Sequence, residues 1–304
     1  MLQFAISAML SFVLGVGSSS NFVTSESYRR AEAVSPEIIL VGSTPGDAMI
    51  KSMVGIDPLK NVDFIRWHLA LNEKGKTSVL NATYGVGKPN TRDFEGGGEK
   101  LLLEGSYVIS NEGKLPTYKL MSDKSPKPIS VLKLNDDLFH ILSPDDRLMV
   151  GSGGWSYSLS RKQMLTTRSK DLPSFSRADL GKSPTEVEFV GRTPCEEIAK
   201  EYEWSTSDEC FKLKWKLVLF RDPKTGEPTT YNLQRTLHRA EPIKGKWTIV
   251  NGPKQMIYRL DPDRPDISIS LLVGDENVLF FLDKENRLFG GNSEFSYTLN
   301  RRSN

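Results

Sequence analysis

The two cysteines of the chain, Cys195 and Cys210, are the residues best suited to covalent or metal chemistry. Two neighbouring cysteines in an oxidising compartment most often pair, and a disulfide across a loop of this length stabilises a fold by about 3 kcal/mol. The same thiolates could instead bind Cu(I), which prefers soft sulfur ligands. A long spacer separates them, and no histidine or methionine adjoins either one. We therefore expect a structural disulfide and no metal or cofactor, with a copper site at Cys195 and Cys210 as the alternative.

The three histidines, His68, His140 and His238, are scattered along the chain. A zinc site needs three or four ligands, usually at short spacing, and these positions do not provide one. The carboxylate pair Asp136 and Asp137 falls where a hairpin turn is expected, rather than in a cleft that could support acid–base chemistry. With no nucleophile–base motif in the sequence, we expect that the protein is not an enzyme.

Bulky aromatic residues recur at matching places in the chain, as the pair Trp67 and Trp215 and the pair Tyr157 and Tyr297. Small β-barrels enclose a cavity when side chains do not fill their interior. These four residues are therefore the candidates for binding an apolar ligand. The alternative is that they form the core of the fold.

The matching aromatic residues belong to an internal repeat that covers Val41–Arg161 and Val190–Arg301. Both copies open on Val-Gly-x-Thr-Pro, and both close on an aromatic residue followed by Ser-Tyr, a hydroxyl residue, Leu, a polar residue and Arg. In the second half of each copy the offset is constant at 140 residues, so that Tyr118 matches Tyr258. A repeat of about 110–120 residues has the size of one small domain, which predicts two domains of the same fold.

The alignment also assigns roles to residues outside the aromatic pairs. His140 matches Phe280, which favours a packing role for the imidazole. Arg161 and Arg301 close the two copies after the last strand, where each could lie over the strand tryptophan of its own copy in a cation–π contact.

Each copy has the pattern of an antiparallel β-domain. Phe64–Leu71 and Phe211–Leu219 alternate polar and apolar side chains, which is typical of a strand with one buried face, and turn residues follow both segments. Thr44 and Thr193, each followed by proline, can cap a short helix. The prediction is an all-β protein of two tandem small antiparallel barrels, each with about eight strands and a short helical insertion.

The ends and the middle of the chain complete this organisation. Residues 1–20 are apolar and then small, which is typical of a signal peptide, although no Lys or Arg precedes the apolar run. We place the first barrel at 37–161, a polar linker at 162–185 and the second barrel at 186–304. No later segment predicts a transmembrane helix, and no cysteine near the leader could carry a lipid. The mature protein is therefore expected to be exported, either periplasmic or secreted.

The second copy resembles the periplasmic domain of the NlpE family of copper-resistance and envelope-stress lipoproteins. The resemblance rests on the segments 191–195, 245–247, 282–288 and 297–301, and it extends more weakly to the first copy. It implies lipocalin-like barrels at the cell envelope, with roles in copper tolerance or stress signalling. The family places two cysteines in a Cys-x-x-Cys motif, whereas here the second has moved to Cys210, and the family's lipid-bearing cysteine is absent.

Charge and composition narrow the function further. The formal net charge is +2, from 40 basic and 38 acidic residues, and the sequence shows no basic cluster, so we do not expect nucleic acid as a partner. The sequence predicts a non-enzymatic protein that binds or senses at the envelope and recognises a small apolar ligand or an envelope protein. The alternative function is copper binding or copper tolerance through the two cysteines.

Overall fold

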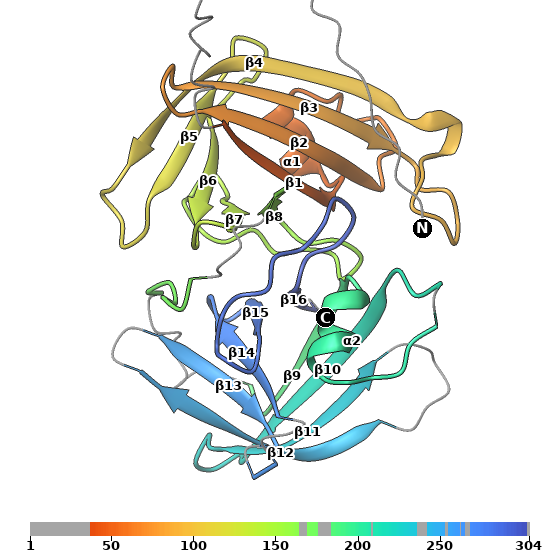
Figure 1. Ribbon diagram of the computed structural model, residues 1–304, viewed down its shortest axis with the longest axis vertical. Helices are drawn as coiled ribbons and strands as arrows, with labels where there is room; N and C mark the ends of the chain where they lie inside the picture. Colours follow the sequence, from red (N-terminus) through yellow and green to blue (C-terminus); the bar gives the residue numbers. More distant parts are fainter. Residues whose placement is uncertain are drawn as a thin grey trace, which may run out of the picture. The chain divides into compact units, whose positions relative to one another are not determined.

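The protein consists of two closed eight-stranded antiparallel barrels in tandem, which confirms the predicted fold class (Figure 1). The computed structural model describes residues 37–163, 169–175, 184–207, 209–235, 242–252, 255–261, 263–264 and 268–302. The predicted signal peptide and parts of the linker lie outside these residues. Within them, no helix has the length and apolar character needed to cross a membrane.

In each barrel every strand pairs with the next along the chain, and the last pairs with the first. The first barrel contains β1 (Glu37–Pro45), α1 (Ala48–Val54), β2 (Phe64–Asn72), β3 (Thr77–Gly85), the 3₁₀ turn η1 (Glu95–Gly97), β4 (Glu99–Ser110), β5 (Thr117–Met121), β6 (Ile129–Lys133), β7 (Leu138–Ile141) and β8 (Ser158–Arg161). The second contains β9 (Glu186–Thr193), α2 (Glu196–Glu201), β10 (Leu213–Arg221), β11 (Pro228–Arg235), β12 (Ile243–Asn251), β13 (Met256–Leu260), β14 (Ile269–Val273), β15 (Val278–Leu282) and β16 (Thr298–Arg301).

The alternating pattern of β2 produces the expected inward face. Ile65, Trp67, Leu69 and Leu71 are all buried in the core of the first barrel. The equivalent strand β10 begins at Leu213, later than the sequence predicted. The residue expected to start it, Phe211, lies with its ring 6.4 Å from that of Phe295 instead of continuing the sheet.

A glycine follows the valine at the start of each copy because β1 and β9 pass close to the last strand of their barrel. A Cβ atom on Gly42 would lie 2.8 Å from the carbonyl oxygen of Ser158, and one on Gly191 would lie 2.6 Å from that of Thr298. Real Cβ atoms do not approach backbone so closely, so the Val-Gly signature of the repeat is a requirement of barrel closure.

Both predicted helices form between the first two strands, but the predicted threonine caps are wrong. Asp47 caps α1 by accepting from the amides of Met49 and Ile50. Cys195 occupies the N-cap position of α2 and makes no side-chain cap. The threonine hydroxyls are used elsewhere, because each accepts a hydrogen bond from the indole of the buried strand tryptophan.

The two barrels, which belong to one compact unit, contact each other through equivalent residues. The hydroxyls of Ser156 and Ser296 are hydrogen-bonded, and Ser158 Oγ lies 2.8 Å from Thr298 Oγ1. Each pair consists of residues 140 positions apart in the sequence, so each residue meets its own counterpart.

A reciprocal pair of contacts surrounds these residues. The amide of Gly151 donates to Asn300 Oδ1, and the amide of its counterpart Gly291 donates to Ser160 Oγ, both at 2.7 Å. Because Ser160 is the counterpart of Asn300, the same contact is made twice with the roles of the copies exchanged. This reciprocity defines an isologous interface, and the barrels are therefore related by an approximate twofold axis that passes between Ser156 and Ser296.

An apolar cluster outside the barrel interiors includes residues of both copies, among them Leu138 of β7 and Phe280 of β15. The described part of the linker contributes Leu172 and Phe175, whose ring is stacked on that of Phe280 at 5.9 Å. The linker therefore packs against the barrels although its composition is polar.

Candidate functional site

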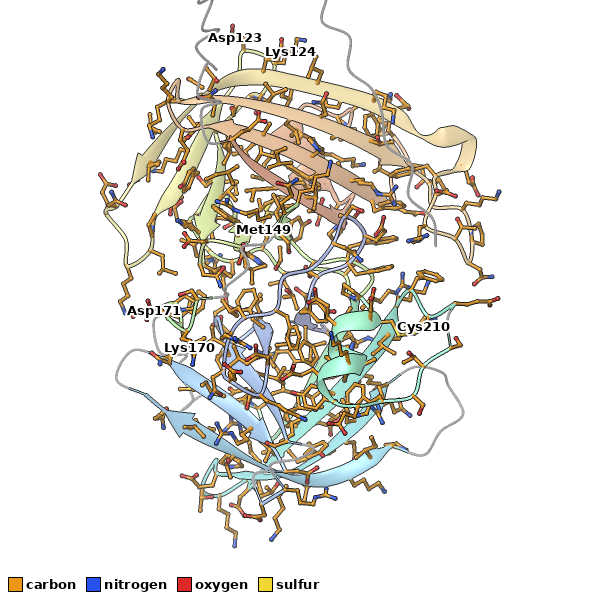
Figure 2. The ribbon with its side chains drawn as sticks, viewed as in Figure 1. Asp123, Lys124, Met149, Lys170, Asp171 and Cys210 are labelled. Carbon is orange, nitrogen blue, oxygen red and sulfur yellow. A yellow bond between two sulfur atoms is a disulfide. The ribbon has the colours of Figure 1, made fainter. Side chains whose placement is uncertain are left out.

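The four aromatic candidates all lie in the barrel cores. Trp67, Trp215, Tyr157 and Tyr297 are 1%, 3%, 0% and 2% exposed, and side chains fill the interior of each barrel around them (Figure 2). Their role in binding an apolar ligand stays a prediction. What the structure adds is a packing role for all four.

Each tryptophan makes the same buried hydrogen bond. Trp67 Nε1 donates to Thr44 Oγ1 and Trp215 Nε1 donates to Thr193 Oγ1, both at 2.9 Å. A buried indole N–H without a partner is costly, which explains why the Thr-Pro pair recurs in the repeat. Among the described residues, neither Arg161 nor Arg301 makes the predicted cation–π contact, and Arg161 Nε donates to the carbonyl of Asp136. An arginine does cover a tryptophan in the second barrel, where the guanidinium of Arg221 lies 4.7 Å from the ring of Trp247.

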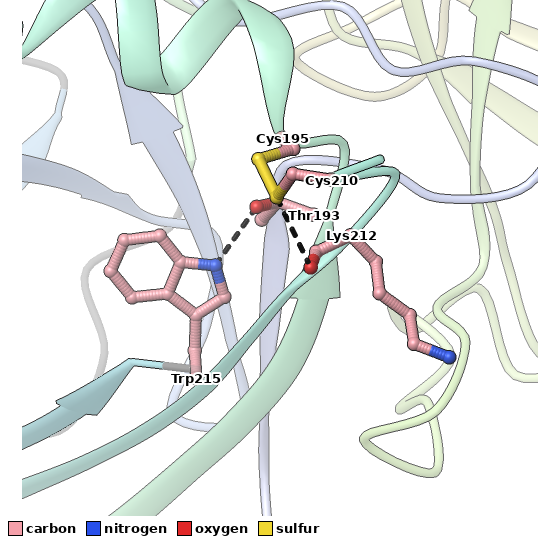
Figure 3. The surroundings of a disulfide bond; sticks show 5 residues. All are labelled: Thr193, Cys195, Cys210, Lys212 and Trp215. Atoms are coloured by element: carbon pink, nitrogen blue, oxygen red, sulfur yellow. Dashed lines mark hydrogen bonds between the residues drawn. A yellow bond between two sulfur atoms is a disulfide. The ribbon is translucent and has the colours of Figure 1, made fainter. Parts of the chain in front are cut away.

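The two cysteines form the predicted disulfide, with their Cα atoms 5.9 Å apart (Figure 3). It joins the start of α2 to the segment that precedes β10, next to the Thr193–Trp215 hydrogen bond. In this form the sulfur atoms are bonded to each other and offer no thiolate to Cu(I). Among the described residues, no three His, Cys, Asp or Glu side chains gather as a metal site.

His140 forms a serine–histidine pair at the twofold axis. Its Nε2 donates to the carbonyl of Met149 at 2.9 Å, which leaves Nδ1 to accept from Ser158 Oγ at 3.0 Å. The ring also contacts that of its counterpart Phe280. Burial lowers the pKa of His140 to about 4, so the imidazole is neutral at physiological pH. A fully buried pair of this kind stabilises the interface and has no access to substrate.

A pocket of about 290 Å³ lies between the barrels, and we call it the central pocket. Equivalent residues of the two copies line it, including the pair Trp155 and Phe295 and the pair Arg66 and Lys214. Arg66 and Lys214 are equivalent because each directly precedes the strand tryptophan and pairs with the residue after the repeated glycine in the first strand of its own barrel. The pocket is therefore centred on the approximate twofold axis.

Cationic side chains dominate the lining of the central pocket. They come from β2, from the β3–β4 loop and from β9 and the start of β10, namely Arg66, Lys88, Arg92, Arg192, Lys212 and Lys214. Three acidic residues, Asp63, Asp93 and Glu294, also line it. Asp63 accepts from the amide of Gly87, and Glu294 accepts from the hydroxyl of Ser293. Within the described part of the chain, none of the six cations forms an ion pair with these acids.

Arg192 and Lys214 are directly opposite each other on neighbouring strands. Like charges at opposed positions of a sheet destabilise it, and in the first copy the corresponding partner of Arg66 is the neutral Ser43. Burial lowers the pKa of Arg192. Burial also lowers the pKa of the nearby Lys212, and the charges of Arg192 and Lys214 lower it further. The second copy thus holds uncompensated positive charge at the pocket.

A stack of aromatic rings forms the floor beside these cations. Phe64 lies between Phe94 and Trp155, with ring centroids 4.1 and 4.7 Å away. The guanidinium of Arg192 lies 5.5 Å from the ring of Trp155, and that of Arg66 lies 5.3 Å from the ring of Phe94. The Nε atom of Arg66 is buried and has no hydrogen-bond partner. The rings hold both guanidinium groups in place, and Arg66 Nη2 also donates to the carbonyl of Arg92.

The sequence interpretation missed this site, although one signal was available. Lys214 and Lys216 alternate in β10 and so lie on one face of the strand, and Lys212 directly precedes it with the same spacing. Arg66 and Arg192 are distant in sequence and join them only when the barrels close and meet.

No protein-family model, curated protein or solved structure matches the chain. The fold and the pocket define a tandem β-barrel protein with a cationic pocket on the symmetry axis between its barrels.

Proposed function

We propose that this is a non-enzymatic binding protein that takes an oxyanion, such as a carboxylate, sulfate or phosphate group, in the central pocket. The observation that carries the proposal is the pairing of Arg192 with Lys214 across two strands, with no acidic partner for either among the described residues. An anion between them would remove their repulsion and satisfy the guanidinium donors, since arginine forms paired hydrogen bonds with planar oxyanions.

A binding role fits the remaining chemistry better than catalysis does. The serine–histidine pair of Ser158 and His140 is fully buried at the interface, so that a substrate does not reach it. The central pocket offers positive charge and hydrogen-bond donors, which bind and orient an anion.

The expected location and family remain part of this proposal. The disulfide supports an oxidising and therefore exported location, periplasmic or secreted. The order of the repeated segments supports the NlpE-like assignment, and a role at the envelope follows from it. The ligand that we propose is anionic, and it binds between the barrels because side chains fill their interiors.

Two lysines on one face of β10 provide a matched test. Lys214 lines the pocket, whereas Lys216 already pairs with Glu188 at 3.0 Å. Isothermal titration calorimetry with sodium sulfate and with citrate should show binding to the wild type. We expect the K214S and R192S variants to lose about tenfold or more in affinity, because hydrogen bonds to charged groups contribute about 1.5–3 kcal/mol. The K216S variant should bind as the wild type does. Equal losses in K214S and K216S, or no binding to the wild type, would rule out the central pocket.

A further inference from the structure

Two further hollows adjoin the central pocket, one on each barrel. The first flank, about 610 Å³, includes Arg66, His68, Lys100 and Lys162 of the first barrel. The second flank, about 480 Å³, includes Arg192, Lys214, Arg301 and Arg302 of the second barrel. Both are lined by the equivalent valine and tryptophan of their copy, Val41 with Trp67 and Val190 with Trp215, so they are symmetry counterparts.

Shared cations connect the three hollows. Arg66 lines both the central pocket and the first flank. Arg192 and Lys214 line both the central pocket and the second flank. The three hollows therefore adjoin one another through shared cationic side chains on both sides of the twofold axis, and we call them together the tract.

The flanks differ from the centre in having no acidic residue in their lining, although Ala82, Leu101 and Leu102 make part of the first flank apolar. Of their cations, Arg302 is partly neutralised by Glu188, which lies 2.9 Å away. Lys100 Nζ donates to a neutral group, Thr83 Oγ1, at 2.8 Å. A single small anion in the central pocket would leave this positive charge without a counterion.

We propose that the tract binds a linear acidic polysaccharide, whose repeated carboxylate groups occupy the two flanks and the central pocket together. The proposal rests on the proposed function of the central pocket and assigns its ligand class. Linking several weak sites by one chain multiplies affinity without any new contact, and three hollows that share side chains are suited to that arrangement.

The aromatic rings argue against a single-stranded nucleic acid as the ligand. Proteins that bind such strands stack the bases on exposed rings. Here Phe64 is covered on both faces by neighbouring rings, while Trp155 lies between Phe64 and the guanidinium of Arg192. The tract thus provides charge and polar hydrogen-bonding groups, such as Asn81 and Ser152, beside the apolar side chains of Leu101 and Leu102, and a hydroxylated chain with apolar C–H faces suits this mixture.

Titration calorimetry with galacturonate oligomers of one to eight sugars tests the proposal on the full chain. We expect affinity to rise about 100-fold with length and then to level off once the tract is spanned. The K100S and R301S variants, one in each flank, should lower the affinity of the octamer about tenfold while leaving that of the monomer unchanged. Lys119 lies on β5 away from the tract, so K119S is the matched control and should bind both ligands as the wild type does.

The outcomes separate this proposal from the one on which it rests. If the galacturonate monomer binds with the expected sensitivity to R192S but longer oligomers bind no more tightly, the polysaccharide proposal is wrong and the central pocket stands. If no uronate binds while sulfate or citrate binds with that sensitivity, the polysaccharide is wrong and the central pocket stands; if none of these anions binds, both proposals fail. Tighter binding of polyglutamate or of a single-stranded oligonucleotide than of the octamer would assign the tract to a different polymer and overturn the polysaccharide.

Discussion

The two barrels solve one structural problem with different chemistry. In the first, Asp47 caps α1 and also accepts a hydrogen bond from the hydroxyl of Tyr157 in the last turn before β8. In the second, α2 has no side-chain cap, and the disulfide of Cys195 attaches its start to the chain before β10. A covalent bond in one copy thus does what the hydrogen-bonded carboxylate of Asp47 does in the other, which indicates that the disulfide is structural.

The copies also differ on their outer surfaces at the axis, where Ser43 corresponds to Arg192 and His140 to Phe280. The interiors, by contrast, keep the same tryptophan–threonine hydrogen bond. The shared tryptophan–threonine pair therefore serves each barrel interior, whereas these differing positions make the contact between the copies asymmetric.

The largest expected effect comes from removing the feature that only the second barrel has. The C195S/C210S variant should destabilise this barrel by about 3 kcal/mol, because the bridge restricts a loop of the unfolded chain. Hydrogen exchange followed by mass spectrometry should show faster exchange in β10 than in the wild type, with β2 unchanged. Equal acceleration in both strands would mean that the disulfide supports the whole molecule.

Acid should weaken the asymmetric contact of His140. Its pKa is about 4 in the folded protein, below its ordinary value of 6.5, so the unfolded state takes up the proton first. The stabilising contribution of the neutral imidazole is complete above pH 6.5 and is lost as the pH falls toward 4. The loss amounts to about 2 kcal/mol at pH 5. Urea unfolding at pH 7 and pH 5 should show a smaller loss for H140F, which makes the first copy like the second. Parallel losses in wild type and H140F would contradict this.

Loss of the tryptophan–threonine hydrogen bond should lower the free energy of unfolding by the same amount in either copy. T44V and T193V each leave a buried Trp Nε1 without an acceptor, which should lower the stability of the affected barrel by about 1–2 kcal/mol. Thermal unfolding of the two variants provides the comparison, and each serves as the control for the other. A clear difference between them would show that the barrels do not depend on the contact equally.

The smallest expected change in stability should have opposite signs when each of two neighbouring lysines is replaced by serine. K214S relieves the repulsion with Arg192 and should stabilise the protein by about 0.5 kcal/mol, whereas K216S removes an ion pair and should destabilise it by a similar amount. Both changes should shrink at high salt. Denaturant titrations in low and high salt would show this, and stabilisation by both variants would argue against specific repulsion at the pocket.

The sequence was a good guide to the barrels because their determinants are local and repeated. The alternation in β2 predicted its buried face, and the Val-Gly and Thr-Pro pairs marked positions that barrel closure and the indole contact require. The caps failed because Thr44 and Thr193 have two possible partners, and only the folded barrel brings the tryptophan within reach. The central pocket could not be predicted because Arg66 and Arg192 belong to different domains, and the interface that joins them depends on side chains far from both.

The linker that joins the barrels changes the thermodynamics of their contact. Two free subunits would have to overcome the entropy of association, but barrels on one chain meet at an effective concentration in the millimolar range, as is typical for short linkers. At that concentration a standard free energy of association of about −4 kcal/mol is already enough for the two barrels to be in contact in half of the molecules. The hydroxyl contacts at the axis, together with the apolar cluster that includes Leu138 and Phe280, can therefore hold together an interface that separate chains would not maintain, and the cationic pocket is assembled from both barrels of one chain.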